Sequence, residues 1–175
     1  MILVVAATER ELHGLEAETL ACGVGPVEAA AVTARALASH RPDTLIHVGI
    51  AGARGIEPPS LVLGSEAVYE DLAAAIPVVD RVRPDAELLE RARLALPEAL
   101  VRPIGTTARV GGTQGCDVEA MEGFAVLRAA ELAGVAALEL RAVANDVEEP
   151  DRARWRFDEA LAALGEATAR LLSAL

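Results

Sequence analysis

The stretch CDVEAMEGFAVLRAAELAGVAALELRAVAND, residues 116–146, decides the fold expected of this chain. It opens with alternating β-type residues, continues with helical spacing from Gly123 to Gly134, and ends in a long apolar strand over 134–146. A strand, a helix and a second strand in this order are typical of α/β folds. Glu122 lies where the first strand gives way to the helix, and an acid there opposes the helix dipole. Taken alone, the stretch favours this capping role for Glu122 over a functional one.

The same alternation runs through the rest of the chain. Runs typical of strands, some continuing into loops, cover 1–11, 18–24, 43–55, 60–71 and 99–112, and helical spacing covers 26–40, 84–96 and 153–175. The polar residues 9–11 are interpreted as a loop after the first strand. We therefore predict one α/β domain over residues 1–175. Its expected architecture is a three-layer sandwich, with a central, largely parallel or mixed sheet flanked by helices.

Charge and composition exclude several classes of function. The formal net charge is −11, whereas a phosphate backbone or a membrane surface calls for a basic face. No apolar run approaches the length of a membrane span, and Ile2–Ala7 is too short and too uncharged for a signal peptide. All 16 basic residues are arginine, so Schiff-base lysines and P-loops are excluded. We expect a cytoplasmic protein that binds neither nucleic acid nor membrane.

The cysteines and histidines do not have the spacing of metal ligands. Cys22 and Cys116 lie far apart without a CxxC motif and are expected to be small buried hydrophobes. His13, His40 and His47 are also widely separated, and His47 in its apolar run is expected in the core. The sequence thus predicts no metal ion and no organic cofactor.

Polar and glycine-rich segments follow the strands at one edge of the predicted sheet, at 9–11, 49–52, 109–113, 121–122 and 145–146. Ligands of open α/β sheets collect beyond the carboxyl ends of the strands, so these segments predict a pocket. The GIAG segment (49–52) is not a GxGxxG fingerprint; its small residues form either a ligand contact or simply a tight turn. Glu11 and Glu122 are the two carboxylates expected to work as a pair, as in hydrolases.

The chain resembles the purine-nucleoside-phosphorylase-like superfamily of nucleoside phosphorylases and nucleosidases. The similar segments, in the superfamily's order, are ATERE (7–11), CGVGPVEAA (22–30), HVGIAGARG (47–55), VEAMEG (118–123) and LRAVAND…RWRFDEAL (140–161). The middle, between residues 68 and 100, looks shortened. Within the superfamily the chain looks most like the futalosine hydrolases of the alternative menaquinone pathway. It also resembles the methylthioadenosine/S-adenosylhomocysteine nucleosidases, but the DRARWRF segment after Asn145 favours the former.

The resemblance implies roles for residues around the sugar. Glu122 matches the glutamate that accepts hydrogen bonds from the ribose 2′ and 3′ hydroxyls, and Met121 matches a residue packed against the sugar. Glu11 matches the acid that orients and deprotonates the attacking water in the hydrolases. Arg141 matches a buried arginine that supports the site without touching the substrate.

The resemblance also implies contacts with the base. Ala51 and Gly52 match residues whose backbone contacts the base and the sugar. Phe157 matches an aromatic residue that lines the base pocket. Asn145 matches the residue that contacts the purine edge. Methylthioadenosine nucleosidases carry an aspartate at that last position. A carboxamide offers a 6-oxopurine both a donor and an acceptor, whereas a carboxylate has no donor unless protonated. Asn145 therefore points to hypoxanthine, unless a shift of one residue puts Asp146 at the base.

The function expected from the resemblance is hydrolysis of the N-glycosidic bond of futalosine by a homo-oligomer. The alternatives are a methylthioadenosine/S-adenosylhomocysteine nucleosidase, a purine nucleoside phosphorylase and a non-enzymatic ligand sensor. Phosphorolysis would need a cationic phosphate cage, for which Arg10, Arg54 and Arg109 are candidates. Glu11 beside the nucleophile would repel phosphate, which favours hydrolysis.

Overall fold

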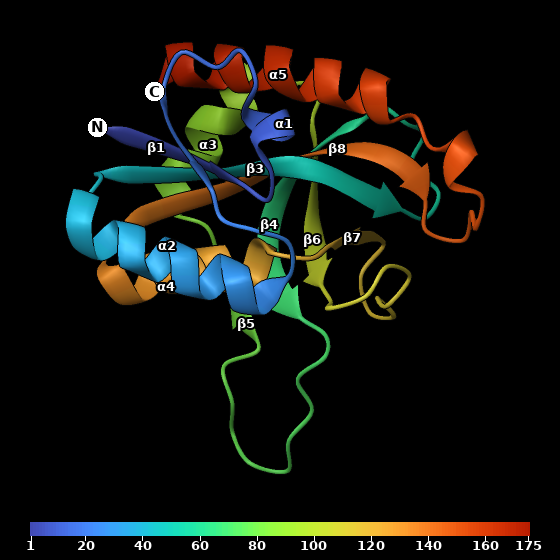
Figure 1. Cartoon of the computed structure of the whole chain (residues 1–175), viewed down its shortest axis with the longest axis horizontal. Helices are drawn as coiled ribbons and strands as arrows, with labels where there is room; N and C mark the ends of the chain where they lie inside the picture. The colour runs from blue at the N-terminus through green and yellow to red at the C-terminus, as the bar shows by residue number, and fades with distance from the viewer.

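A mixed sheet of eight strands forms the centre of the structure, a computed structural model that describes residues 1–175 (Figure 1). The strands are β1 (Ile2–Ala6), β2 (Glu18–Ala21), β3 (Thr44–Ala53), β4 (Leu61–Tyr69), β5 (Arg81–Val82), β6 (Leu100–Thr106), β7 (Val118–Ala120) and β8 (Ala136–Asp146). Their order is β2-β1-β3-β7-β6-β4-β5, and β8 pairs in parallel with β3 and antiparallel with β4. The strands β3, β8, β4, β6 and β7 therefore pair in a closed ring.

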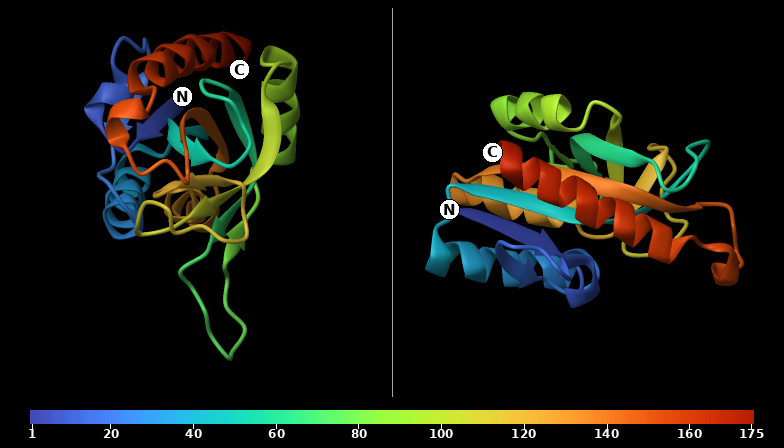
Figure 2. Two further views of the ribbon diagram at one scale, coloured as in Figure 1. Left: turned by 90° about the vertical axis from the view of Figure 1, so that its right-hand side faces the viewer. Right: turned by 90° about the horizontal axis from the view of Figure 1, so that it is seen from above.

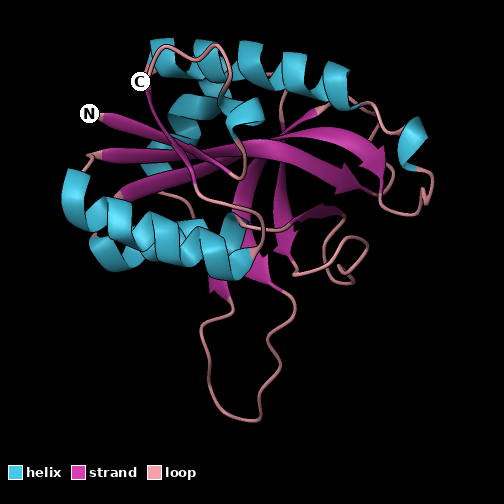
Figure 3. Cartoon of the chain, in the orientation of Figure 1, coloured by secondary structure: helices cyan, strands magenta, loops and turns pink.

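Helices cover both faces of the sheet, as predicted. They are α1 (Glu9–Leu12), α2 (Pro26–His40), α3 (Ala86–Ala95), α4 (Gly123–Ala133) and α5 (Phe157–Ala174), with a short 3₁₀ turn, η1 (Arg152–Arg154), before α5. In the views of Figures 1 and 2, α1, α3 and α5 lie on one face, and α2 and α4 on the other. Figure 3 shows the strands between these two layers of helices. None of the helices combines the length and the apolar character needed to cross a membrane.

The two faces of the sheet bury separate aliphatic cores. Leu45 and Ile46 are neighbours on β3, and because strand side chains alternate they enter opposite cores. Ile46 packs in the core that includes Leu164 of α5, and Leu45 in the core that includes Leu127 of α4. A strand buried on both sides needs apolar residues at every position, which explains the continuous apolar run in the sequence.

Two segments differ from their predicted structure. Residues 9–12 form one turn of helix instead of a loop, because the Glu11 carboxylate folds back and accepts a hydrogen bond from the Thr8 N–H at 2.9 Å. The C-terminal helix begins at Phe157 instead of residue 153. Asp151 accepts a hydrogen bond from the Ala153 N–H, and the turn that it starts ends at the extended residue Trp155.

Both cysteines and His47 are buried, as predicted. The cysteines are free thiols. Burial raises the pKa of each to about 12, assisted by the charge of Glu122 near Cys22. Neither thiol is therefore ionised near neutral pH, which fits the predicted role of small core residues.

Candidate active site

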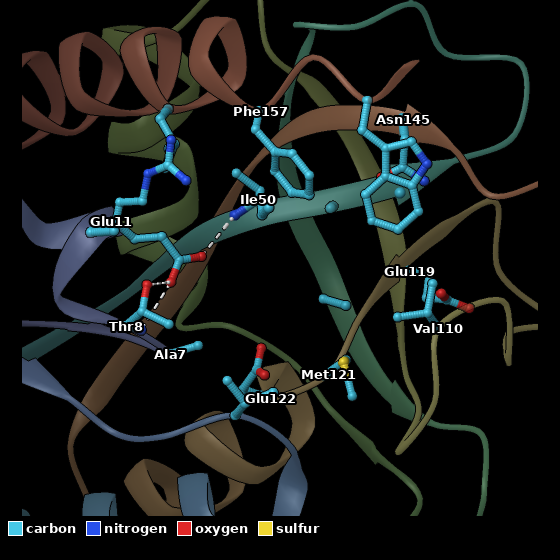
Figure 4. A pocket seen from close by; sticks show the side chains of 17 residues that line it. Ala7, Thr8, Glu11, Ile50, Val110, Glu119, Met121, Glu122, Asn145 and Phe157 are labelled. Carbon is cyan, nitrogen blue, oxygen red and sulfur yellow. Dashed lines mark hydrogen bonds between the residues drawn. The ribbon is translucent and has the colours of Figure 1, made fainter. Parts of the chain in front are cut away.

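A cavity of about 340 Å³ opens where β1, β3, β7 and β8 end (Figure 4). Seven of the eight residues singled out in the sequence line it: Glu11, Ala51, Gly52, Met121, Glu122, Asn145 and Phe157. The eighth, Arg141, lies behind this wall and is fully buried. The predicted pocket at the strand ends is thus present, and it gathers side chains from segments more than 130 residues apart.

Glu122 is the N-cap residue of α4, but its side chain makes no hydrogen bond to the helix. Its Oε1 instead accepts a hydrogen bond from the Gly25 N–H at 3.0 Å, and its Oε2 lies 3.8 Å from Nη2 of Arg141. Gly25 has a φ of +88°, a conformation that favours glycine. The turn at 23–25 therefore presents the Gly25 N–H to Glu122, whose side chain faces this turn and Arg141 and makes no capping hydrogen bond.

Glu11 points into the same cavity from α1. Its Oε2 accepts hydrogen bonds from the Thr8 N–H and hydroxyl, both at 2.9 Å, and its Oε1 accepts one from the Ile50 N–H at 3.2 Å. Figure 4 shows these contacts, with the Glu11 carboxylate between Thr8 and Ile50 and Glu122 lower in the same view. Both carboxylates are thus held in one orientation, Glu122 by the Gly25 N–H and Glu11 by Thr8 and the Ile50 N–H of β3.

Asn145 and Asp146 lie in different environments. Asn145 is buried at the end of β8 beside Gly52, and its Nδ2 donates a hydrogen bond to the Asp146 carbonyl at 2.8 Å. Its Oδ1 has no hydrogen-bond partner in the protein. Asp146 is exposed and accepts a hydrogen bond from the Glu148 N–H in the following turn. The residue at the cavity is therefore Asn145, and the register shifted by one residue does not occur.

The wall above these polar groups is aromatic and aliphatic. The rings of Trp155 and Phe157 lie 5.3 Å apart, tilted by 48°, and the Trp155 Nε1–H donates to the Glu149 carbonyl. Sequence reasoning missed Trp155, although a single tryptophan beside Phe157 in so aromatic-poor a chain was an available signal.

Glu119 is a second cavity residue that the sequence analysis did not identify. Its two oxygens accept hydrogen bonds from the Gly111 and Thr113 N–H groups, at 2.6 and 2.7 Å. Glu70 binds the same loop through the Thr113 hydroxyl and the N–H groups of Gln114 and Gly115. Burial acts to raise the pKa of Glu70, but these hydrogen bonds outweigh it and lower the pKa to about 2. Two carboxylates thus fix the loop that carries Val110 to the cavity wall.

Positive charge is scarce at the cavity. Of the three arginines considered for a phosphate cage, only Arg10 lines it, and Arg10 is paired with Asp158 at 2.6 Å. Arg54 donates to the carbonyls of Thr113 and Cys116 instead. No group of three or more His, Cys, Asp or Glu side chains is arranged to hold a metal ion. The cavity is therefore lined by three carboxylates (Glu11, Glu119 and Glu122) and one paired arginine.

Comparison with known proteins gives consistent matches. The family model of the phosphorylase superfamily matches residues 7–175. The chain is 40% identical over 189 residues to the futalosine hydrolase of Streptomyces coelicolor, covering 90% of this chain and 79% of that protein. It is 32% identical over 190 residues to the futalosine hydrolase of Thermus thermophilus, covering 94% and 84%. The methylthioadenosine/S-adenosylhomocysteine nucleosidase structure from Neisseria meningitidis shares the fold, with a TM-score of 0.87, 19% identity and 99% coverage of both chains.

Proposed function

The chain belongs to the phosphorylase superfamily and, within it, to the futalosine hydrolase family; from this premise we propose that it hydrolyses the N-glycosidic bond of futalosine. The products are hypoxanthine and dehypoxanthine futalosine, and the reaction belongs to menaquinone biosynthesis. The chain is thus an enzyme, a hydrolase of N-glycosyl compounds that acts on a small nucleoside.

The observation that carries this proposal is the pair of oriented carboxylates in one cavity. Cleavage of an N-glycosidic bond develops positive charge on the sugar and negative charge on the departing base. Glu122, held by Gly25, is assigned to the ribose, where it accepts hydrogen bonds from the 2′ and 3′ hydroxyls and stabilises the cationic sugar. Glu11, held by Thr8 and Ile50, is assigned to the attacking water, from which it takes a proton. Met121 packs against the sugar, with Arg141 behind Glu122.

Asn145 is assigned to the base. Its free Oδ1 can accept a hydrogen bond from a purine N–H, and its Nδ2 can donate to a purine acceptor if it leaves the Asp146 carbonyl. A 6-oxopurine presents such a donor and acceptor, so the carboxamide is compatible with hypoxanthine as the leaving group. Ala51 and Gly52 then lie beside the base and sugar, with Phe157 on the apolar wall.

Hydrolysis fits the charges of the cavity better than phosphorolysis. A phosphate nucleophile would enter a space lined by three carboxylates, with only the paired Arg10 to attract it. A neutral water molecule meets no such repulsion.

Hydrolysis of methylthioadenosine and S-adenosylhomocysteine is the second candidate, because the nucleosidase from Neisseria meningitidis that acts on these compounds has the same fold. The relatives that are 40% and 32% identical to this chain are futalosine hydrolases, whereas this nucleosidase is 19% identical, which ranks this candidate below futalosine hydrolysis.

A purine-release assay tests the proposal. Purified protein should release hypoxanthine from futalosine faster than from inosine, and adenine from methylthioadenosine slowest of the three. Added phosphate should not change the rate or yield a sugar phosphate. Preference for methylthioadenosine, or a requirement for phosphate, would replace the proposed function by the corresponding alternative.

We also propose that the protein is a cytoplasmic homo-oligomer. Val24 and Val110 are exposed at the cavity mouth, at 59% and 47%, and Ile76 is 71% exposed in the segment that projects between β4 and β5 (Figures 1 and 2). Apolar residues in such positions support contact with a second copy. Two free cysteines fit a reducing compartment. Light scattering should give a mass at least twice that of the chain, and cell fractionation should recover the protein in the cytoplasm.

A further inference from the structure

Three buried polar side chains form a cluster behind Glu122. Glu139 and Arg141 are two residues apart on β8 and so share one face of the strand. His47 is paired in register with Glu139 on the neighbouring strand β3. The exposed fractions of His47, Glu139 and Arg141 are 0%, 0% and 1%. The proposed function uses Glu122 and Arg141 but gives no role to Glu139.

Arg141 is held in one orientation by this cluster. Its Nε–H donates to Oε1 of Glu139 at 2.8 Å, and its Nη2–H donates to Nε2 of His47 at 2.6 Å. Position 49, opposite Arg141 on β3, is a glycine; a Cβ there would lie 2.2 Å from Nη1. The guanidinium group therefore fills the space of a missing side chain, with Nη2 directed toward Glu122 at 3.8 Å.

His47 does not carry a charge in this cluster. Its Nδ1–H donates to the Val5 carbonyl at 3.0 Å, which leaves Nε2 as the acceptor for Arg141. Burial, and then the charge of Arg141, lower the pKa of His47 well below its ordinary value. The positive charge of Arg141 therefore acts on the carboxyl groups around it, those of Glu139, Glu122 and Glu11.

Glu139 is incompletely paired. Oε1 has the hydrogen bond from Arg141, but Oε2 is buried without any partner. The carboxyl group lies against the start of α4, where a Cβ on Gly123 would be 2.3 and 2.4 Å from its two oxygens. The helix does not satisfy Oε2, since the Phe124 N–H donates to the Thr106 hydroxyl instead.

A protonated acid fits this environment better than a carboxylate. An unpaired oxygen that carries charge costs far more in a dry interior than a neutral hydroxyl does. The charged groups that face Glu139 are Arg141 on its own strand and Glu122 before α4. Burial, which is the largest effect, raises the pKa of Glu139 together with the charge of Glu122, and Arg141 opposes them.

We infer that Glu139 is a positioning residue that acts as a neutral carboxylic acid, holding Arg141 through Nε so that the arginine's charge is directed to Glu122. This rests on the role proposed for Glu122 at the ribose. The arginine then holds Glu122 in its orientation, and a second buried anion does not compete for the charge of the arginine. An ionised Glu139 would be the counter-ion of Arg141 and would weaken that support.

Two variants distinguish these roles of Glu139. Glu139→Gln mimics the neutral acid and can still accept the Nε–H, so kcat on futalosine should stay within about threefold of wild type. Glu139→Leu keeps the size but not the acceptor, so kcat should fall about 10²-fold, with a smaller change in KM, because Arg141 and Glu122 lose their alignment. A 10²-fold loss in Glu139→Gln at an unchanged melting temperature would show that the negative charge is needed and overturn the inference. Wild-type kcat in Glu139→Leu would overturn it as well.

Infrared spectroscopy tests the protonation state without substrate or turnover. The spectrum of wild type minus that of Glu139→Gln at neutral pH should contain the carbonyl band of a protonated carboxyl group. The same difference for the exposed Glu131→Gln should contain carboxylate bands and serves as the control. Carboxylate bands for Glu139 would overturn the inference, even if Glu139→Leu does not fold. Failure of wild type to hydrolyse futalosine would overturn the proposed function instead, so the two failures are distinguishable.

Discussion

The carboxylate of Glu122 accepts a hydrogen bond from the backbone N–H of Gly25, 97 residues earlier in the chain. This contact ties the turn before α2 to the start of α4. It occupies one position on Oε1, while Oε2 faces Arg141 at 3.8 Å and the side chain lines the cavity. An acid at a helix start thereby lines the cavity.

Replacing Glu122 by glutamine should lower kcat about 10²–10³-fold, the cost of losing one charge-stabilising contact in the transition state. The fold should remain intact, because an amide can still accept the Gly25 hydrogen bond. Steady-state kinetics and a melting curve check both points, with Glu131→Gln on the exposed face of α4 as the matched control. Wild-type rates would remove Glu122 from the mechanism.

Replacing Glu11 by glutamine should lower kcat by roughly 10²–10⁴-fold and change KM little, since general base catalysis acts in the chemical step. Glu9→Gln, in the same turn of helix but exposed, should keep the wild-type rate. The comparison is made at saturating futalosine. A rise in KM at constant kcat would mean that Glu11 binds substrate and does not activate water.

Replacing Asn145 by aspartate should lower hypoxanthine release and, where the pocket permits, raise activity on methylthioadenosine. A mismatched buried hydrogen-bonding edge leaves polar groups unpaired, so the discrimination between the two substrates can reach about 10⁴-fold in wild type. The measurement is kcat/KM for both substrates. Asp146→Asn is the control and should change much less, because Asp146 is exposed in the turn. A larger effect at 146 than at 145 would contradict the assignment of the base contact.

Because of Glu70, the free energy of unfolding should decrease as the pH falls below about 4.5. Its folded pKa of about 2 lies below the ordinary value of 4.5, so its contribution is present above pH 4.5 and is lost as the pH falls toward 2. Glu70→Gln should therefore cost about 1–2 kcal/mol at pH 7, after allowance for solvent screening, and much less near pH 3. Chemical denaturation of both proteins at the two pH values gives the comparison. Equal destabilisation at both would show that the loop contacts do not depend on charge.

Activity should survive exhaustive chelation. The mechanism uses only side chains and water, so dialysis against a chelator should leave kcat unchanged, with metal content checked by elemental analysis. Recovery of activity only on adding zinc or magnesium would contradict the mechanism.

The sequence predicted the architecture well because its signals are local. The apolar runs of β3 and β8 and the helical spacing of α2 and α4 each lie within one segment of chain. The loop at 9–12 was misjudged because its helical turn depends on a single side chain, Glu11, that bonds back to Thr8. Such contacts are not visible in hydrophobic periodicity.

The place of the cavity could be predicted because strand ends meet at one edge of the sheet, and most of its residues were implied by the resemblance to the superfamily. The cluster of His47, Glu139 and Arg141 could not. Spacing on β8 puts Glu139 and Arg141 on one face, but their encounter with His47 depends on the register between β3 and β8. The role of Glu119 likewise depends on how the loop at 111–113 folds over β7.

The missing side chain at position 49 constrains the order in which this site can change over evolutionary time. While Arg141 is present, any larger residue at 49 collides with its guanidinium group. If Arg141 is first replaced by a small residue, this clash is removed, and position 49 can accept a side chain once Glu11 Oε1, 2.9 Å from such a Cβ, moves aside. If position 49 is filled first, the intermediate protein carries both the new side chain and Arg141, which collide. The two positions are therefore epistatic, and a lineage that fills position 49 has already given up its arginine.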